Sequence, residues 1–361
     1  MAEYKFSDVF EDVTRKGRKI PANQYLLEGK YPIIDQGKED VGGYTNAQDG
    51  LFTNVPAIIF GDHTRIIKYV DEPFFIGADG VKILEKKVVG ADYKYLFYAL
   101  THAHIPNTGY NRHFKFLKEV SIPIPDIADQ CKIVQQLDLL SSIIDKQLKS
   151  LKIYDNLVKS RFIEMFGDIN MNTKNWPIKP LGELCDIYRG GSPRPINKFL
   201  GGDVPWIKIG DATQGDEIYL HSTKEHIIKD GVKKSRMVKS GSLIFANCGV
   251  SLGFARIITF DGCIHDGWLA FEDVDESLDK VFLLLSLNQL TEYFRAIAPD
   301  GTQPNLNTAI MKMHQQIIPP IKLQRQFVEF VRQADKSKLS IQQSIETLQT
   351  LKAKLMQEYF G

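Results

Sequence analysis

Three polar loops in each half of the sequence carry the side chains best suited to bind a ligand. The first loop spans residues 15–19 or 189–194, the second 62–65 or 246–251, and the third 107–113 or 301–307. Arg pairs bidentately with guanine edges, Asn and Gln pair with adenine edges, and Lys, Ser and Thr donate to phosphate oxygens. Together with a basic run at 233–236, the loops supply these candidate DNA-contacting residues: Lys16, Arg18, Lys19, His63, Thr64, Arg65, Tyr110, Asn111, Arg112, Arg189, Ser192, Arg194, Lys233, Lys234, Arg236, Asn247, Ser251, Thr302, Gln303, Asn305 and Asn307.

No catalytic or metal-binding signature accompanies these loops. The sequence has no G-x-x-x-x-G-K-[ST] phosphate loop and no H-E-x-x-H zinc motif. Asp62 and His63 are adjacent, but an Asp-His pair in a loop more often faces solvent or DNA than acts as an acid and a base. The loops could also be solvated turns, in which Gly190, Gly191 and Gly249 are turn residues rather than points of close approach. We expect no catalytic residue, no metal and no cofactor in this chain.

The composition sets broad limits on the class of protein. A length of 361 residues predicts two or three domains, and a hydrophobic content of 43% is typical of a globular protein. The net charge of +1 does not favour a protein that coats nucleic acid by charge alone. No apolar run is long enough for a membrane span, and the first residues do not form a signal peptide. The four cysteines form no C-x-x-C pair, which fits reduced thiols in a cytoplasmic protein.

Two long segments must position these loops. Residues 122–167 and 318–361 both open with a proline-rich stretch, continue without Pro or Gly through the following helix, and close with Phe-Gly. Apolar residues recur in them every seven positions, which is typical of a coiled coil, and the closing Gly suits a left-handed C-cap. Lys338 and Lys352 interrupt the second apolar stripe. The expected helix-pair packing residues are Leu137, Ile144, Leu151, Val158, Met165, Phe327, Ile341, Leu348 and Leu355.

The two segments form part of a tandem duplication of a globule followed by a long helix. The offset between copies is 196 residues at Ile122/Ile318 and Gln130/Gln326 but 194 at Phe166/Phe360, which predicts a drift of two residues along the helix. The globules match at offsets of 173 at 31–37, 185 at 58–60 and 187 at 79–80. We therefore expect four segments: globule 1–121, helix 122–167, globule 168–317 and helix 318–361. Because the two globules share few side chains, they should handle two different ligands.

Several motifs in this order resemble those of a known family. Residues 176–184 (WPIKPLGEL), 190–193 (GGSP) and 204–207 (VPWI) resemble the start of a target recognition domain. Residues 234–244 and 249–253 resemble its middle, and residues 301–307 (GTQPNLN), 318–321 (IPPI) and Gln326 resemble its end and the following helix. This arrangement resembles the DNA specificity subunit of type I restriction-modification enzymes, and the resemblance covers essentially the whole chain.

The resemblance implies an α+β fold with two similar target recognition domains, each a mixed α/β globule with a twisted sheet. Two long antiparallel coiled-coil helices would separate them. Each globule would read half of a bipartite target in double-stranded DNA while the helices set the spacing. Two methyltransferase subunits, which bind S-adenosylmethionine, would dock along the helices, and motor-nuclease subunits would join for cleavage. The specificity subunit itself would perform no chemistry.

Two other functions remain open from the residues alone. The helices could be a docking rod for proteins in a scaffold that does not bind DNA. The chain could instead be a methyltransferase, but it lacks the Asn/Asp-Pro-Pro-Tyr/Phe run that the resemblance leads us to expect in such an enzyme.

Overall fold

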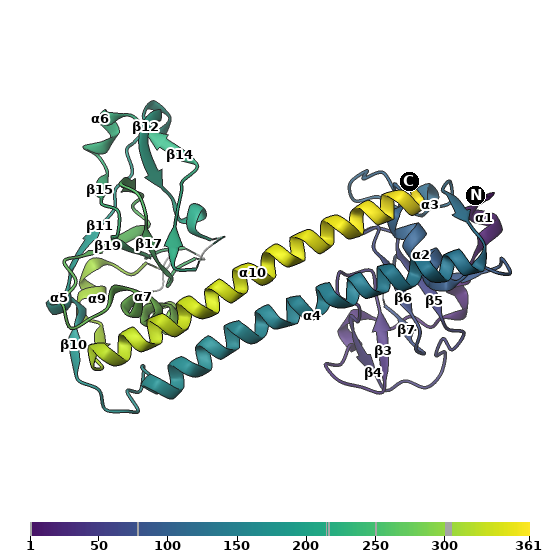
Figure 1. The fold of residues 1–361 in the computed structure, drawn as a ribbon, viewed down its shortest axis with the longest axis horizontal. Helices are drawn as coiled ribbons and strands as arrows, with labels where there is room; N and C mark the ends of the chain where they lie inside the picture. The colour runs from purple at the N-terminus through teal and green to yellow at the C-terminus, as the bar shows by residue number, and fades with distance from the viewer. Residues whose placement is uncertain (1, 78, 214, 216, 250, 300–304) are drawn as a thin grey trace. The chain divides into compact units, whose positions relative to one another are not determined.

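The two long helices and two globules are distributed over two compact units. The computed structural model describes residues 2–77, 79–213, 215, 217–249, 251–299 and 305–361. Unit 1 comprises Met1–Lys149 and Ile341–Gly361, and unit 2 comprises Ser150–Ser340. The long helices are α4 (Ile127–Phe166) and α10 (Ile321–Phe360), drawn in teal and yellow in Figure 1. Each unit therefore contains one globule, the beginning of one long helix and the end of the other.

The described residues of unit 1 form three small sheets. A four-stranded antiparallel sheet has the order β2 (Phe10–Asp12), β8 (Val81–Lys86), β5 (Ala57–Gly61), β6 (Ile67–Val70). A second sheet has the order β4 (Gly43–Thr45), β3 (Tyr31–Ile34), β7 (Phe75–Ile76), and β1 (Ala2–Lys5) pairs with β9 (Ser121–Ile124). The helices are α1 (Phe6–Val9), α2 (Tyr93–His102) and α3 (Phe114–Leu117), with 3-10 turns at Thr14–Lys16 and Ala22–Gln24.

Unit 2 repeats this plan with additional strands. Its first sheet has the order β11 (Asp186–Arg189), β19 (Trp268–Glu272), β16 (Leu243–Ala246), β17 (Ala255–Ile258), β13 (Tyr219–Leu220). Its second has the order β14 (Glu225–Ile227), β12 (Leu200–Ile207), β18 (Gly262–Ile264), β15 (Arg236–Val238), and β10 (Ile178–Pro180) pairs with β20 (Gln315–Ile317). The helices are α5 (Leu181–Leu184), α6 (Lys229–Val232), α7 (Lys280–Gln289), α8 (Thr291–Ile297) and α9 (Thr308–Met313), with 3-10 turns at Ile196–Lys198 and Ile209–Ala212.

The strand registers confirm that the globules are copies of one fold. In unit 1 Ile58 pairs with Leu84, and in unit 2 Leu243 pairs with Phe271, which preserves the offsets of 185 and 187 seen in the sequence. The parallel pairs β3–β7 and β12–β18 also correspond. The expected α+β architecture of two similar mixed globules with long helices is thus confirmed.

In unit 2 the segment that corresponds to α2 is divided into two helices. Residues 281–294 are not a single helix, because α7 ends at Gln289 and α8 begins at Thr291. The backbone at Leu290 leaves helical geometry, with φ −95° and ψ 12°. Thr291 stabilises the break, since its hydroxyl donates to the carbonyls of Asn288 (2.9 Å) and Gly253 (2.7 Å).

Each long helix is fastened to its globule by a buried glutamine near its start. Gln130 Oε1 accepts the Asp92 N–H at 2.8 Å, and its Nε2 donates to the carbonyls of Pro125 (2.8 Å) and Gly90 (3.2 Å). Gln324 Oε1 accepts the Asp279 N–H at 2.8 Å, and its Nε2 donates to the carbonyls of Pro319 (2.7 Å) and Ser277 (2.8 Å). Asp92 and Asp279 in turn cap α2 and α7. Both glutamines are fully buried, so these hydrogen bonds satisfy backbone groups that water does not reach.

These contacts correct the predicted drift between the copies. The partner of Gln130 in the repeat is Gln324, at an offset of 194, and not the exposed Gln326. The offset of 194 also relates the two ends at Phe166 and Phe360, and both helices have 40 residues. The two-residue drift is therefore wrong, because the sequence comparison matched a residue type rather than a hydrogen-bonding position.

The ends of the helices are packed into the globules by aromatic rings. In unit 1 the ring of Phe360 lies 5.3 Å from that of Tyr95 on α2. In unit 2 the ring of Phe166 lies 4.8 Å from that of Phe282 on α7, at the corresponding position of the repeat. Gly167 follows with φ +77°, which is the predicted left-handed C-cap.

Within each unit, α4 and α10 run antiparallel. In unit 1 Gln136 contacts Tyr359 at 2.6 Å, while Gln147 contacts Ser344 at 2.9 Å. In unit 2 Phe162 and Phe327 pack with ring centroids 5.3 Å apart. Of the residues expected in the seam between them, Leu137, Ile144 and Phe327 are buried and the following are half-buried: Leu151, Val158, Met165, Ile341, Leu348 and Leu355. Among the described residues, no helix combines the length and the apolar character needed to cross a bilayer.

Replacing either buried glutamine by alanine should destabilise the protein. Gln130→Ala or Gln324→Ala leaves a buried N–H and two carbonyls without partners, which costs about 1–3 kcal/mol of unfolding free energy. The matched control is Gln326→Ala, whose side chain is exposed and which should change stability by less than about 0.5 kcal/mol. Urea denaturation measures the difference. Equal effects at 324 and 326 would contradict the corrected repeat.

A partly buried histidine should make the protein sensitive to acid. The ring of His314 lies 5.0 Å from Phe294, and its Nε2 has no hydrogen-bond partner among the described residues. Burial lowers the pKa of His314 from 6.5 to about 4. Between these values the unfolded chain binds a proton that the folded chain does not, so stability is lost as the pH falls from 6.5 towards 4.

The loss attributable to His314 is on the order of 2 kcal/mol, allowing for partial solvent exposure. His314→Leu removes the titrating group, and unfolding curves at pH 7.5 and pH 5 should then differ less for the variant than for the original protein. Parallel pH dependences would show that His314 does not titrate in this way.

Candidate nucleic-acid interface

In unit 1 the three predicted loops meet around the turn at Asp79 and Gly80. Lys19 of the first loop pairs with Asp79, with Nζ 2.6 Å from Oδ1. Gln36 joins the turn to the second loop, because its Nε2 donates to the Asp79 carbonyl at 3.2 Å and its Oε1 accepts the His63 N–H at 3.2 Å. The hydrogen bond and the charge of Lys19 lower the pKa of Asp79, and the positive charge of Arg112 in the third loop adds to this effect.

An aromatic pair lies at the outer face of the same loops. The rings of His63 and Tyr110 stack at a centroid distance of 4.9 Å and an interplanar angle of 13°. Tyr110 is 90% exposed, so its ring is available for contact with a base or sugar. Thr64 is exposed, while Arg65 is half-buried, has φ 62° and donates to the Ile105 carbonyl at 3.1 Å. Arg65 therefore also holds the loop in shape.

Other predicted residues of unit 1 are exposed but do not join the Asp79 turn. Lys16 pairs with Glu85 at 3.0 Å, and Arg18 donates to the Asp49 carbonyl at 3.2 Å. Asn111 donates to the Thr108 carbonyl and thereby closes the third loop on itself. Exposure leaves these side chains accessible to a duplex, so their predicted DNA contacts stay predictions.

In unit 2 the corresponding turn is at Asp266 and Gly267. The Ser192 hydroxyl donates to Asp266 Oδ1 at 2.7 Å, and His265 Nε2 lies 3.0 Å from the same oxygen. Arg194 lies 3.9 Å from Oδ2, and Arg189 Nε donates to the backbone carbonyl at 3.1 Å. Burial raises the pKa of Asp266, but the Ser192 hydrogen bond and the neighbouring positive charges outweigh it and lower the pKa overall. Asp266 thus orders the first loop of unit 2.

The basic run at residues 233–236 lies beside that loop. A Cβ on Gly190 would lie 2.1 Å from the His265 carbonyl oxygen, and one on Gly191 would lie 2.8 Å from the Lys234 carbonyl oxygen. These glycines are therefore points of close approach, whereas Gly249 has φ +73° and is a turn residue. The run itself is anchored by rings, because the Arg236 guanidinium lies 4.4 Å from the Tyr188 ring centroid and Lys234 Nζ lies 4.8 Å from the Phe199 ring centroid. Lys233 is exposed.

Asn247 does not have the exposure that a DNA-contacting residue needs. Its side chain is fully buried and donates to Asn305 Oδ1 and the Leu306 carbonyl, both at 3.2 Å. The corresponding residue of unit 1, Asp62, is also buried, and its Oδ1 accepts the Phe114 N–H at 2.7 Å. Both residues tie the second loop to the third. The structure therefore corrects the predicted contact by Asn247, which anchors a loop and does not reach the surface.

The rest of the third loop of unit 2 is only partly covered by the structure. Asn307 is exposed and caps α9 by accepting the Ile310 N–H at 2.9 Å, while Asn305 and Ser251 are half-buried. The predicted contacts by Thr302 and Gln303 lie outside the described residues. Sequence reasoning missed Asp79, Asp266 and Gln36 as organising residues. The signal available was the recurrence of Asp-Gly at an offset of 187, which served only to align the two globules.

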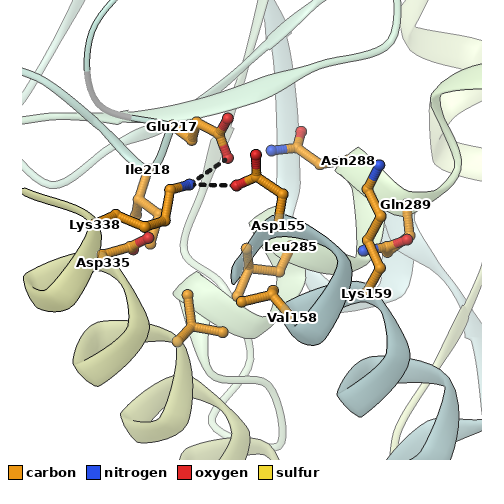
Figure 2. Close-up of a pocket in the computed structure, with 11 residues that line it drawn as sticks. Asp155, Val158, Lys159, Glu217, Ile218, Leu285, Asn288, Gln289, Asp335 and Lys338 are labelled. Atoms are coloured by element: carbon orange, nitrogen blue, oxygen red, sulfur yellow. Dashed lines mark ion pairs between the residues drawn. The ribbon is translucent and has the colours of Figure 1, made fainter. Parts of the chain in front are cut away.

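Unit 2 also contains a cavity of about 280 Å³ where α4 and α10 lie beside α7 (Figure 2). Lys338 Nζ lies 2.7 Å from Asp155 and 3.9 Å from Glu217, and both ion pairs are dashed in Figure 2. Burial lowers the pKa of Lys338, but the hydrogen bond to Asp155 and the nearby carboxylates raise it overall. No group of metal-ligating side chains occurs among the residues that the structure describes. Because helix residues rather than the three loops form most of its lining, the cavity belongs to the helix pairing.

Type I restriction enzyme specificity subunits match part of the sequence. The chain is 27% identical over 253 residues to the "Type I restriction enzyme EcoR124I/EcoR124II specificity subunit" of Escherichia coli, covering 63% of this chain and 58% of the relative. It is 24% identical over 162 residues to the MjaIX specificity subunit of Methanocaldococcus jannaschii, covering 43% of this chain and 37% of the relative. These matches span less than two thirds of either relative.

Solved structures match over nearly the full length. The crystal structure of a type I restriction-modification system S subunit from M. genitalium aligns with a TM-score of 0.61 at 18% identity, covering 100% of this chain and 96% of that one. The family described as "Type I restriction modification DNA specificity domain" matches residues 1–152 and 173–351. The chain, with its two copies of one globule and its paired long helices, therefore belongs to the type I restriction-modification DNA specificity domain family.

Proposed function

We propose that this chain is the non-catalytic DNA specificity subunit of a type I restriction-modification complex. The supporting observation is that both units carry the same loop arrangement around an Asp-Gly turn but present different side chains on it. Unit 1 offers Lys19 with a His63–Tyr110 stack, while unit 2 offers Arg194, Ser192 and the basic run at 233–236. One scaffold with two different surfaces suits the reading of two different half-sites in double-stranded DNA.

The long helices are proposed to set the spacing and to carry the partners. A continuous helix of 40 residues is about 60 Å long. The helices expose apolar side chains of the kind that mark protein-binding surfaces: Leu139, Leu148, Ile153, Leu157, Ile163, Leu339 and Leu351. We propose that two methyltransferase subunits dock there and bind the S-adenosylmethionine, with motor-nuclease subunits completing the complex in the cytoplasm.

The proposed domain boundaries follow the sequence repeat. We propose residues 1–121 and 168–317 as the two target recognition domains. Residues 122–167 and 318–361 are the conserved-region helices. The boundaries of the compact units differ from those of these segments. Each long helix begins in the unit of one globule and ends in the unit of the other globule, so it is divided between the two units.

Removing the basic run of unit 2 should weaken DNA binding. The triple variant Lys233→Ala, Lys234→Ala, Arg236→Ala should lower affinity in the complex with methyltransferase and reduce the slope of log affinity against log salt by up to about 3. The matched control removes three exposed lysines outside the loops, the basic run and the long helices, Lys5, Lys87 and Lys179, with the same change in charge. Fluorescence anisotropy at several salt concentrations measures both quantities. Unchanged affinity in the loop variant would favour the scaffold that does not bind DNA.

Removing the exposed ring of Tyr110 should reduce base specificity in only one half of the bipartite target. In a host that expresses the complete methyltransferase complex, methylome sequencing should show a motif of two segments with an unread spacer. Tyr110→Ala should broaden the bases accepted in one segment, since a lost base contact costs about 1–3 kcal/mol of discrimination. Tyr4→Ala, in β1, is the control for an exposed tyrosine outside the loops. A motif without two segments, or one changed in both halves, would contradict the assignment.

A further inference from the structure

An aspartate stands among the basic side chains of both candidate recognition surfaces. Asp79 and Asp266 occupy equivalent places in the repeat, at an offset of 187, and each is followed by Gly. In unit 1 the carboxylate pairs with Lys19 at 2.6 Å, and in unit 2 it lies 3.9 Å from Arg194. The two globules share few side chains elsewhere on these loops, so the recurrence of a carboxylate at this point is informative.

The carboxylate of Asp266 is held in place by several partners. Its Oδ1 accepts the Ser192 hydroxyl and faces His265 Nε2, its Oδ2 faces Arg194, and its backbone carbonyl accepts Arg189 Nε. The side chain is only 36% exposed, so its charge is partly shielded from solvent and acts strongly on its neighbours. It fixes the positions of the side chains predicted to meet DNA.

Asp79 also pairs with a basic side chain, but its carboxylate is more exposed to solvent than that of Asp266. Its side chain is 88% exposed, and it neutralises Lys19 at the surface. The Gln36 side chain links the backbone of Asp79 to the second loop through two hydrogen bonds. Arg112 of the third loop contributes a further positive charge near this carboxylate. In both units, therefore, a carboxylate lies beside a basic side chain of the candidate recognition surface.

We propose that Asp79 and Asp266 are specificity-determining residues that act as internal counter-ions on the recognition surfaces. The inference rests on the proposed DNA-reading function and adds to it a mechanism of discrimination. A phosphate must displace the carboxylate from Lys19 or Arg194 before it can pair with the cation, and repulsion opposes that step. A duplex with the correct bases is held by base contacts in a position in which its phosphates need not displace the carboxylate, whereas a non-target duplex binds only through its phosphates and bears the full cost. Each aspartate thereby lowers affinity for non-target DNA more than affinity for the target.

The test compares Asp79→Asn and Asp266→Asn with the original chain, each in the complete complex with methyltransferase. Dissociation constants are measured for a duplex carrying the methylated motif and for a duplex of random sequence, at 50–200 mM salt (about the range over which phosphate contacts are most sensitive). Each variant should bind the random duplex about two- to fivefold more tightly at the lowest salt and gain less on the target. The ratio of the two affinities should shrink accordingly.

Two controls separate charge from folding and from general electrostatics. Asp79→Glu and Asp266→Glu keep the charge and should retain the original affinity for random DNA. Asp8→Asn and Asp203→Asn change net charge equally at exposed positions outside the loops and should not alter the ratio. If the Glu variants behave like the Asn variants, loop geometry rather than charge is responsible, and the proposal is overturned.

The remaining outcomes also decide. If an Asn variant loses target affinity while random binding is unchanged, the aspartate reads a base directly, as carboxylates can at cytosine N4, and the counter-ion role is excluded. If the original complex discriminates between duplexes and the Asn variants discriminate equally well, the inference fails while the proposed function stands. If the original complex shows no preference for the motif, the proposed function itself fails.

Discussion

The attachment of each long helix to its globule depends on one fully buried amide. Gln130 and Gln324 satisfy a backbone N–H and two carbonyls at the points where the chain enters α2 and α7. A buried backbone group without a partner is costly, so the loop and the helix start cannot separate without exposing or stranding these groups. Because Asp92 and Asp279 also cap the neighbouring short helices, the direction of the long helix is fixed together with the core of the globule.

The two copies preserve the contacts that build the loops and vary those that face outward. Asp62 and Asn247 are both buried and both join the second loop to the third, although one is a carboxylate and the other an amide. By contrast, the surface of unit 1 carries a stacked His63–Tyr110 pair, while the described part of unit 2 carries Arg and Lys side chains resting on aromatic rings. Divergence restricted to the outer side chains changes what is recognised without changing the scaffold.

Much of this architecture could be predicted from hydrophobic periodicity and repeated motifs. The buried strand β5, the helix α2 and the 40-residue helices follow directly from their apolar patterns, and the offsets of 173, 185 and 187 reappear as equivalent strand registers. Residue type alone could not distinguish Gln324 from Gln326, since both lie on the first turns of α10 and only one faces the globule.

Residue type alone was also insufficient to predict which side chains form the candidate interface. Asn247 has the side chain of an adenine reader, but a fully buried position gives it a structural role. The role of Asp266 does not follow from its residue type, because an acidic residue does not suggest contact with a polyanion. Asp266 nevertheless orders the basic side chains that are predicted to contact DNA. The burial and the pairing of a polar side chain depend on segments that are distant in sequence. A local sequence pattern therefore does not reveal them.

The two lysines in the seam show how polar residues can define the pairing of α4 and α10. In unit 1 Lys352 donates to Ser141 Oγ at 2.7 Å and lies 5.7 Å from the Tyr98 ring centroid, and burial lowers its pKa. In unit 2 Lys338 is 16% exposed and pairs with Asp155. A shift of the pairing by one heptad would leave each ammonium group against apolar residues without its partner, which costs more than the lost packing of a methylene group. The contacts of Lys352 with Ser141 and of Lys338 with Asp155 are therefore compatible with one register of the helix pair and not with a register shifted by a heptad.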